Sequence, residues 1–294
     1  MDAANLIAEL NGKFKSESIS FGTWKDSSLP TAFISNQYCK GAVSPYGAHV
    51  LSYVPNGEKD LIMVSELSAY EPPKAIRGGV PVCWPWFGPA AKPMHGVARI
   101  QYWNMTAVRK ESDGSDTVVF SLSICEPHRL DAVFEVNFGA KLSMKLITVN
   151  QGDSAYSLGG ALHTYFSVGE IEKVTISGLG GSTYCDRAGG GNIPGCLCKG
   201  DFGFTAETDN IYASNAAVTI IDPVFDRKIL VEKSGSEATV VWNPWVEKSK
   251  LISEFRDDEY HVMVCVEAAN CGDDIIDLKP GMSHTLTQTI SLVR

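Results

Sequence analysis

The sequence contains no long hydrophobic run, no block of basic residues and no nucleotide-binding glycine motif. Among its 294 residues, no apolar stretch approaches the ~18 residues that a membrane-spanning helix requires. Lys and Arg number 25 against 34 Asp and Glu, which gives a net charge of −9. Nucleic acids are bound by clustered Lys and Arg, which this sequence lacks, so we expect no nucleic-acid partner. Because a membrane-spanning stretch is also missing, we expect no membrane partner.

Signals for secretion and for metal binding are also missing. The first residues, MDAANLIAELNGKF, have no cationic start and no apolar core, so they do not resemble a secretory signal. The eight cysteines are scattered; only Cys196 and Cys198 lie close together, without a second pair at zinc-finger spacing. The histidine motifs of metalloenzymes and the nucleophile elbow of hydrolases are absent. We therefore expect a cytoplasmic protein with free thiols, no bound metal and no cofactor.

Hydrophobic periodicity predicts an all-β fold. Apolar and polar residues alternate through 133–149, which predicts one long, half-buried strand. Further strands are predicted at 117–125, 216–221, 238–242, 261–267 and 284–293, with turn residues between them. Helical periodicity is confined to short pieces such as 2–10, and the strand–helix alternation of α/β folds is missing. We expect a large antiparallel β-sandwich with few short helices, forming a single domain over 1–294 with its core at about 20–294. The glycine-rich stretch 178–195 is interpreted as a long loop over one face.

Two loop segments place arginine and histidine among aromatic or conformationally special residues. The segment RGGVPVCWPWFGP, 77–89, begins with Arg77 and contains three aromatic rings that could face a sugar or fill the core. In MHGVARIQYW, 94–103, His95 and Arg99 would share a face of a helix, but we expect a bent strand instead. A guanidinium there could equally pair with an acidic side chain.

Two strand segments carry residues suited to proton transfer. His163 lies in ALHTYFSVGE, 161–170, where it could be a general acid or a hydrogen-bonded core histidine. Glu267 ends the apolar strand within 261–270 with no nearby Lys or Arg, so it either binds something or reaches solvent. Two further polar residues lie beside aromatics and, taken alone, would be solvated: Asp209 and Lys248.

Six segments together resemble one enzyme family. They are RGGVPVCWPWFG at 77–88, HGVAR at 95–99, LHTYFSVG at 162–169, ETDNIY at 207–212, VVWNPWVEKSK at 240–250 and VCVEAAN at 264–270. The six segments occur in the same order in the hexose-6-phosphate mutarotases (glucose-6-phosphate 1-epimerases) of the aldose 1-epimerase superfamily, which this sequence therefore resembles. The resemblance covers the chain from about 20 to 290. It implies a galactose mutarotase-like β-sandwich that uses neither a metal nor an organic cofactor.

The resemblance also implies roles for individual residues. His163 matches the general acid and Glu267 the general base, and this fits the chemistry of opening a hemiacetal, which needs one proton given and one taken. Arg77 and Arg99 match positions that hold the substrate, with the 6-phosphate as their expected partner.

Further positions concern the sugar itself. Asp209 matches a position that hydrogen-bonds sugar hydroxyls, and we also place His95 among the substrate-binding residues. Met94 stands where the family often has a polar residue, so the preferred hexose stays open.

The expected function is interconversion of the α and β anomers of a hexose 6-phosphate by a monomer. Two arginines could make a local pocket positive although the whole protein is acidic. The alternatives are an aldose 1-epimerase for free sugars and a non-catalytic sugar-binding or regulatory module. A glycoside hydrolase would need two carboxylates across the bond, and Glu267 has no clear partner for that.

Overall fold

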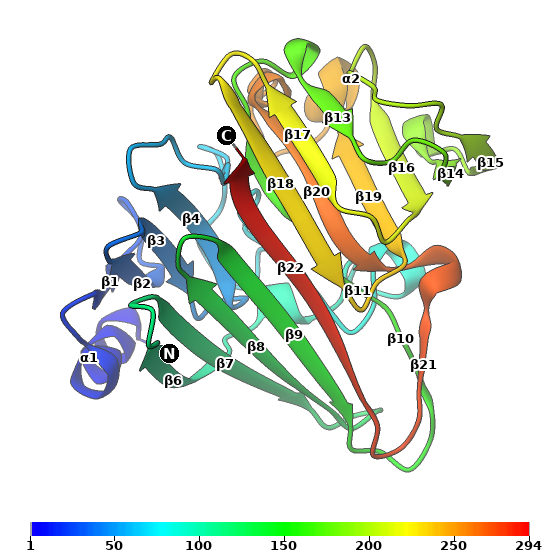
Figure 1. The fold of residues 1–294 in the computed structure, drawn as a ribbon. Helices are drawn as coiled ribbons and strands as arrows, with labels where there is room; N and C mark the ends of the chain where they lie inside the picture. The colour runs from blue at the N-terminus through cyan, green and yellow to red at the C-terminus, as the bar shows by residue number, and fades with distance from the viewer. Residues whose placement is uncertain (1, 294) are drawn as a thin grey trace.

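Two eight-stranded antiparallel sheets form the body of the protein in the computed structural model, which describes residues 2–293 (Figure 1). The first sheet has the order β13 (Thr175–Ser177), β17 (Val218–Asp222), β18 (Arg227–Ser234), β22 (Ser283–Val293), β9 (Leu142–Asn150), β8 (Leu130–Phe138), β7 (Asp116–Ile124), β6 (Asn104–Lys110). The second has the order β15 (Ile193–Leu197), β14 (Thr183–Asp186), β16 (Thr208–Ala213), β19 (Ala238–Asn243), β20 (Met263–Asn270), β11 (Gly160–Leu162), β5 (Val82–Cys83), and β12 (Tyr165–Ser167) also pairs with β20. The predicted all-β sandwich is confirmed.

Smaller elements complete the fold. A four-stranded sheet is formed by β1 (Ile19–Thr23), β2 (Pro30–Ser35), β3 (Cys39–Ser44) and β4 (His49–Pro55), and a two-stranded sheet by β10 (Tyr156–Leu158) and β21 (Ile276–Leu278). The α-helices are α1 (Ala3–Phe14), slightly longer than predicted, and α2 (Trp245–Ser249). Single 3-10 turns are η1 (Gly88–Ala90), η2 (Ala98–Ile100), η3 (Ile171–Lys173), η4 (Ala188–Gly190), η5 (Glu259–Val262) and η6 (Gly272–Asp274). No helix among the described residues is long and apolar enough to cross a membrane.

The two large sheets are joined through β22 and β20, which lie one over the other (Figure 1). A buried glutamine links them: Gln288 of β22 donates its side-chain N–H to the Val266 carbonyl of β20 at 2.9 Å and accepts a hydrogen bond from the Thr164 hydroxyl. Buried apolar residues of both sheets and of the four-stranded sheet form one continuous core. This core fixes the second sheet, which carries the candidate site.

The alternation over 133–149 belongs to two strands rather than one. β8 and β9 are joined by a tight turn at 139–141, and Phe138 pairs with Leu142 across it. Even-numbered residues face the core in both strands, so the period-two pattern passes through the turn unchanged. The predicted single strand was therefore wrong, although the predicted buried face is confirmed.

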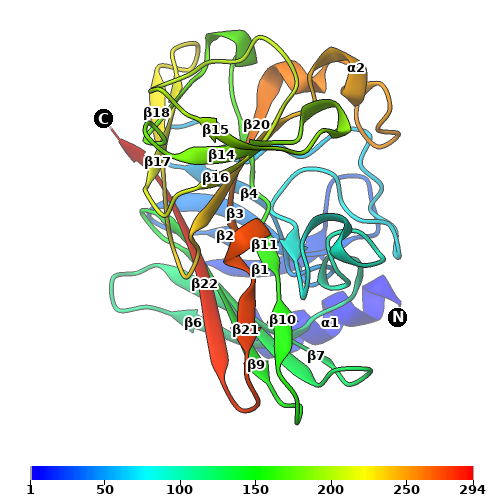
Figure 2. The ribbon, with the colours of Figure 1, turned by 90° about the vertical axis from the view of Figure 1, so that its right-hand side faces the viewer.

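The glycine-rich stretch 178–195 is also not a loop. β14 and β15 form a hairpin at the edge of the second sheet, with η4 between them, as Figure 2 shows on the side facing the viewer. The first residues of the predicted strand at 261–267 belong to η5. The strand itself, β20, starts two residues later than expected, at Met263, and ends three residues later, at Asn270. All eight cysteines are free, as predicted.

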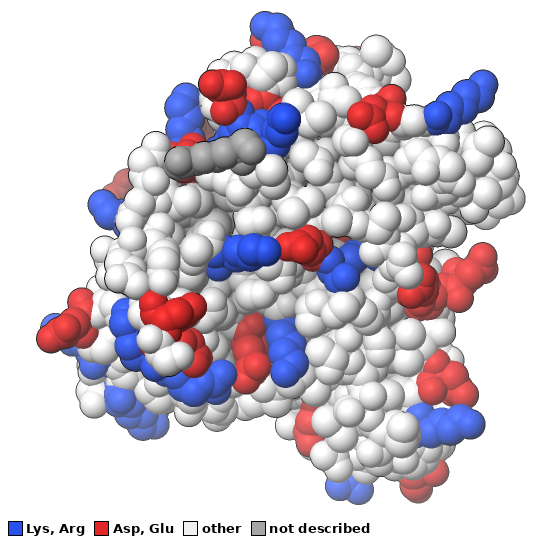
Figure 3. Space-filling model, viewed as in Figure 1, with Lys and Arg blue, Asp and Glu red and all other residues white. Residues whose placement is uncertain are grey.

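Charges of both signs are interspersed on the face seen in Figure 3, which has no broad basic patch.

Candidate active site

A cavity of about 260 Å³ opens on the second sheet and brings together five of the six predicted site residues. These are Arg77, His95, His163, Asp209 and Glu267. Its apolar walls include Phe87, Met94, Trp242 and Ile252. The residues come from segments far apart in the sequence, so only the sheet brings them into one place.

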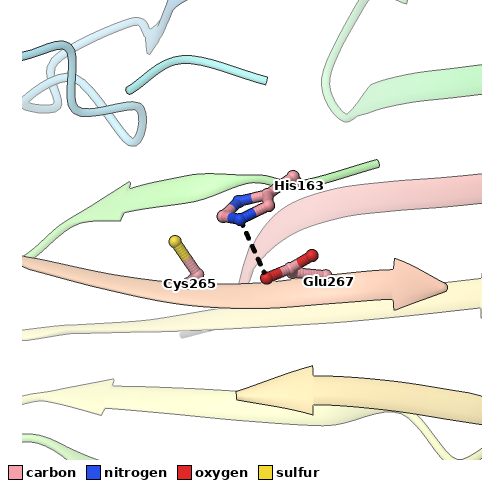
Figure 4. A group of neighbouring side chains, drawn as sticks. All are labelled: His163, Cys265 and Glu267. Atoms are coloured by element: carbon pink, nitrogen blue, oxygen red, sulfur yellow. Dashed lines mark ion pairs between the residues drawn. The ribbon is translucent and has the colours of Figure 1, made fainter. Parts of the chain in front are cut away.

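His163 and Glu267 lie opposite each other on neighbouring chain segments. The antiparallel pairing of Leu162 with Ala268 and of Tyr165 with Cys265 fixes the register between β11, β12 and β20. His163 occupies the break between β11 and β12, directly across from Glu267 in β20. Its Nε2 is 3.3 Å from Glu267 Oε1, as Figure 4 shows.

Both side chains are held almost out of water. His163 is 8% exposed and Glu267 1% exposed, and His163 Nδ1 and Glu267 Oε2 have no hydrogen-bond partner within residues 2–293. Burial raises the pKa of Glu267 well above its usual range, and the nearby Asp209 raises it further. Burial lowers the pKa of His163, with further lowering from His95 and Arg99. Both shifts have the same cause, because burial disfavours an ionised carboxylate and a protonated imidazole alike.

Aromatic rings fix the orientation of the His163 imidazole. It stacks on Tyr165 with centroids 5.0 Å apart and an angle of 15°, and Trp242 meets it edge-on at 6.1 Å. His95 approaches as a second edge at 5.5 Å. His163 and Tyr165 both line the cavity.

His95 lies in a turn rather than in a bent strand, with φ of 65°. Its Nδ1 accepts the Gly88 N–H at 3.3 Å. Burial and, to a smaller extent, the charges of Arg99, Arg77 and Arg187 lower its pKa to about 3, so the ring is neutral at physiological pH. The ring proton then lies on Nε2, which can donate a hydrogen bond to an oxygen in the cavity.

Two arginines line the cavity without a carboxylate partner. Arg77 Nη1 donates to the Tyr165 hydroxyl at 3.3 Å, and its buried Nε has no acceptor within residues 2–293. Arg187 follows β14, and its backbone N–H donates to the Asp209 carbonyl at 2.8 Å. Its guanidinium forms neither an ion pair nor a hydrogen bond with the part of the chain that the structure describes. Free guanidinium groups in a cavity favour an anionic ligand.

Arg187 was missed by the sequence analysis because it lies in the stretch interpreted as a loop. In the sequence, Arg187 is a single cationic residue among glycines, and this pattern does not indicate a binding site. Its place in the cavity becomes clear only when the β14–β15 hairpin is known. Arg187, Phe87 and Pro89 also line a neighbouring cavity of about 760 Å³ that includes neither His163 nor Glu267.

Arg99 is not among the residues that line the cavity. It lies in η2, and its Nη2 donates to the Met94 carbonyl at 2.9 Å, beneath the turn that carries His95. The predicted bent strand over 94–103 was wrong, because His95 lies in a turn and Arg99 lies in the 3-10 turn η2. Arg99 thus supports the turn, and its direct contact with a phosphate stays a prediction.

Asp209 and Lys248 form the polar wall opposite the aromatic rings. Lys248, on α2, has its Nζ 2.7 Å from a Glu207 carboxylate oxygen and 3.6 Å from one of Asp209. Burial raises the pKa of Asp209, an effect that Lys248 and Arg187 oppose. Asp209 lines the cavity, and its role as an acceptor for sugar hydroxyls stays a prediction.

Cys265 adds a thiol to the acid–base pair. One ligand atom each from His163, Cys265 and Glu267 lies within 4.8 Å of the others, a group that could hold a metal ion (Figure 4). Burial raises the pKa of Cys265 well above its usual range.

Several known proteins are similar to this chain in sequence and in fold. A family model described as Aldose 1-epimerase matches residues 31–291. The chain is 32% identical over 276 residues to an Escherichia coli (strain K12) protein named "Putative glucose-6-phosphate 1-epimerase", covering 90% of this chain and 91% of that protein. A Salmonella typhimurium crystal structure described as a "putative mutarotase (YeaD)" matches with a TM-score of 0.86 and 28% identity, covering 98% of this chain and 99% of that one.

A galactose 1-epimerase from Lactobacillus acidophilus NCFM matches with a TM-score of 0.70 over 95% of this chain and 99% of that one. At 14% identity this likeness concerns the fold alone. The stacked antiparallel sheets with a cavity on one of them define a β-sandwich protein of the galactose mutarotase-like class. With the family model matching most of its length, the chain belongs to the aldose 1-epimerase family.

Proposed function

We propose that this protein interconverts the α and β anomers of a hexose 6-phosphate, as an isomerase that needs only its own side chains. The observation that carries the proposal is the buried His163–Glu267 pair in a small cavity whose wall also carries arginines with no carboxylate partner within residues 2–293. The names of the relatives, which include glucose-6-phosphate 1-epimerases, support the same reaction.

The reaction follows from the proton held by the pair. Ring opening requires a proton on the ring oxygen and the loss of the proton of the anomeric hydroxyl. The proposed reaction requires the proton of the pair on His163, so that the imidazolium donates to the ring oxygen while the Glu267 carboxylate accepts from the hydroxyl. Each such transfer contributes about 10²–10⁴-fold to the rate.

Closure of the ring needs no separate resetting of the pair. Rotation about the C1–C2 bond presents the other face of the open aldehyde to the C5 hydroxyl. His163 then takes a proton back from that hydroxyl, and Glu267 returns its proton to the carbonyl oxygen. The pair ends with one proton, as it began, so the same site works in both directions.

Charged walls favour a phosphorylated sugar over a free one. Arg77 and Arg187 offer guanidinium groups that can bind phosphate oxygens in pairs. His95 Nε2 and Asp209 supply a donor and an acceptor for ring hydroxyls. Because one chain supplies every one of these residues, we also propose that the monomer is active.

Exchange of anomers tests this function directly. Saturation-transfer NMR on the purified protein would compare glucose 6-phosphate, galactose 6-phosphate and free glucose. We expect acceleration with a hexose 6-phosphate and weaker acceleration with the free sugar. Equal acceleration of both would instead favour an aldose 1-epimerase for free sugars. Binding without any exchange would leave the non-catalytic sugar-binding module as the function.

A further inference from the structure

We propose that His163, Cys265 and Glu267 form an inhibitory binding site for a thiophilic divalent cation such as Zn²⁺. The proposed reaction uses His163 and Glu267 but not the thiol beside them. The three side chains offer a nitrogen, a sulfur and an oxygen, all within 4.8 Å of one another (Figure 4). Two of the groups also have buried polar atoms without partners within residues 2–293, His163 Nδ1 and Glu267 Oε2.

The distances suit a tetrahedral ion. Zinc–nitrogen and zinc–oxygen bonds of about 2.0–2.2 Å place neighbouring ligand atoms roughly 3.3–3.5 Å apart in a tetrahedron. His163 Nε2 and Glu267 Oε1 are already 3.3 Å apart. The sulfur needs a contraction of about 1 Å at most, because a zinc–sulfur bond is about 2.3 Å long. The fourth position then faces the cavity, where water can bind.

Charge balance makes a buried cation tolerable here. Arg77 and Arg187 in the cavity wall disfavour an isolated cation. On binding, the Cys265 thiol and the His163–Glu267 pair each release one proton to solvent, so that thiolate and carboxylate together cancel the two charges of the ion. A site with sulfur and imidazole ligands prefers Zn²⁺, Co²⁺ or Cd²⁺ to Mg²⁺ or Ca²⁺, which prefer oxygen ligands.

Occupation of this site would stop the proposed reaction. The ion takes the Nε2 lone pair of His163 and an oxygen of Glu267, so neither residue can carry a proton. This inhibitory effect rests on the proposed function, whereas the binding itself does not.

The test therefore reads binding and activity separately. Co²⁺ is titrated into the whole protein, and the near-ultraviolet absorption band of a thiolate–cobalt bond is recorded, with Zn²⁺ binding measured by calorimetry. Cys265→Ser keeps the size of the side chain, and Cys265→Ala provides a second variant if serine prevents folding. Cys196→Ser is the matched control, because Cys196 lies on the β14–β15 hairpin and is not part of the group formed by His163, Cys265 and Glu267.

We expect a thiolate band in the wild type and in Cys196→Ser that is lost in Cys265→Ser, with Zn²⁺ binding roughly 100-fold weaker. Zn²⁺ should inhibit anomer exchange and EDTA should restore it, while millimolar Mg²⁺ has no effect. Inhibition is compared with the metal-free rate of each variant. A band that persists without Cys265, or equal Zn²⁺ inhibition in both cysteine variants, would overturn the proposal. If no anomer exchange is seen but the band depends on Cys265, the metal site stands and the proposed function fails.

Discussion

Glu267 is a buried ionisable residue with a proposed role in catalysis. A substitution at this position can show separately what its burial costs in stability and what it contributes to the rate. Glu267→Gln keeps the size of the side chain and removes the proton acceptor. We expect anomer exchange to fall by about 10²–10⁴-fold. Saturation-transfer NMR measures the exchange, and circular dichroism serves as the control for folding.

The same variant should be more stable at neutral pH. The pKa of Glu267 is raised above its ordinary value of 4.5, so its contribution to stability is complete below pH 4.5 and is lost as the pH rises through the folded-state pKa. Glutamine has no such loss. Urea unfolding should therefore show a higher free energy of unfolding for Glu267→Gln at pH 7 and a smaller difference near pH 4.5. A variant less stable at pH 7 would contradict this account.

Arg187 gives a second prediction at the scale of one residue. Arg187→Ala should raise the KM for a hexose 6-phosphate while changing the weak reaction of the free sugar much less, because the lost group binds only the phosphate. Lys199→Ala removes an exposed cation from the segment following β15 and serves as the control. Equal losses for phosphorylated and free sugars would show that Arg187 does not recognise the phosphate.

The residues predicted from the sequence and the residue that was missed differ in their surroundings. His163 and Glu267 lie in apolar strand segments where a titratable group is unusual, so burial and chemistry could be expected together. Arg187 lies among glycines and exposed residues, and only the pairing of β14 with β16 turns it toward the cavity. Arg99 shows the reverse case, since its family match says nothing about the carbonyl that its guanidinium contacts.

At the scale of elements, side-chain periodicity predicted faces better than boundaries. The β8–β9 turn keeps the parity of buried positions, so no pattern of apolar residues could reveal it. The β14–β15 hairpin has little hydrophobic alternation because its strand β15 is largely exposed at the sheet edge. Both elements are fixed by pairing with distant strands, which a local pattern does not contain.

The turn that carries His95 depends on Gly96. This residue has φ of 78°, and an added Cβ would overlap the Trp84 carbonyl oxygen, which accepts hydrogen bonds from two backbone N–H groups. Gly57 has φ of 83° with no atom near its Cβ position, so Gly57→Ala measures the cost of the backbone conformation alone. We expect about 1–2 kcal/mol for Gly57→Ala. Gly96→Ala should cost a further ~1–3 kcal/mol from the overlap.

Urea unfolding measures both glycine variants, and the mutarotation rate shows whether the turn still presents His95. Equal losses of stability in Gly57→Ala and Gly96→Ala would mean that the turn around Gly96 can shift to accommodate the added Cβ at no further cost in free energy. In that case His95 would not be held in place by Gly96.

At the scale of the whole molecule, the net charge of −9 does not decide the ligand. Positive and negative side chains are mixed over the surface seen in Figure 3, whereas the cavity wall holds Arg77 and Arg187 without carboxylate partners within residues 2–293. A sugar phosphate needs only this local reversal of sign, because its charge is confined to one group. An acidic protein can therefore bind a small anion and still repel nucleic acids.

Buried histidines should make the molecule less stable in weak acid. Within the His163–Glu267 pair the two pKa shifts oppose each other, because burial lowers the pKa of His163 and raises that of Glu267. His49 has no such compensation. It is fully buried in β4, and its Nε2 contacts the Gly78 carbonyl oxygen at 2.8 Å. Burial lowers its pKa from 6.5 to about 4.

The stability contributed by a neutral His49 is complete above pH 6.5 and is lost as the pH falls toward its folded-state pKa of about 4. At pH 5 the unfolded chain gains about 2 kcal/mol from protonating this residue, while the folded chain gains almost nothing. His49→Gln can still donate to the Gly78 carbonyl but does not titrate, so its free energy of unfolding should fall less between pH 7 and pH 5. Urea unfolding across this range checks the slope, with His128→Gln, at an exposed position, as the control. If His49→Gln and the wild type lose stability in parallel, His49 is not the group that makes the fold sensitive to acid.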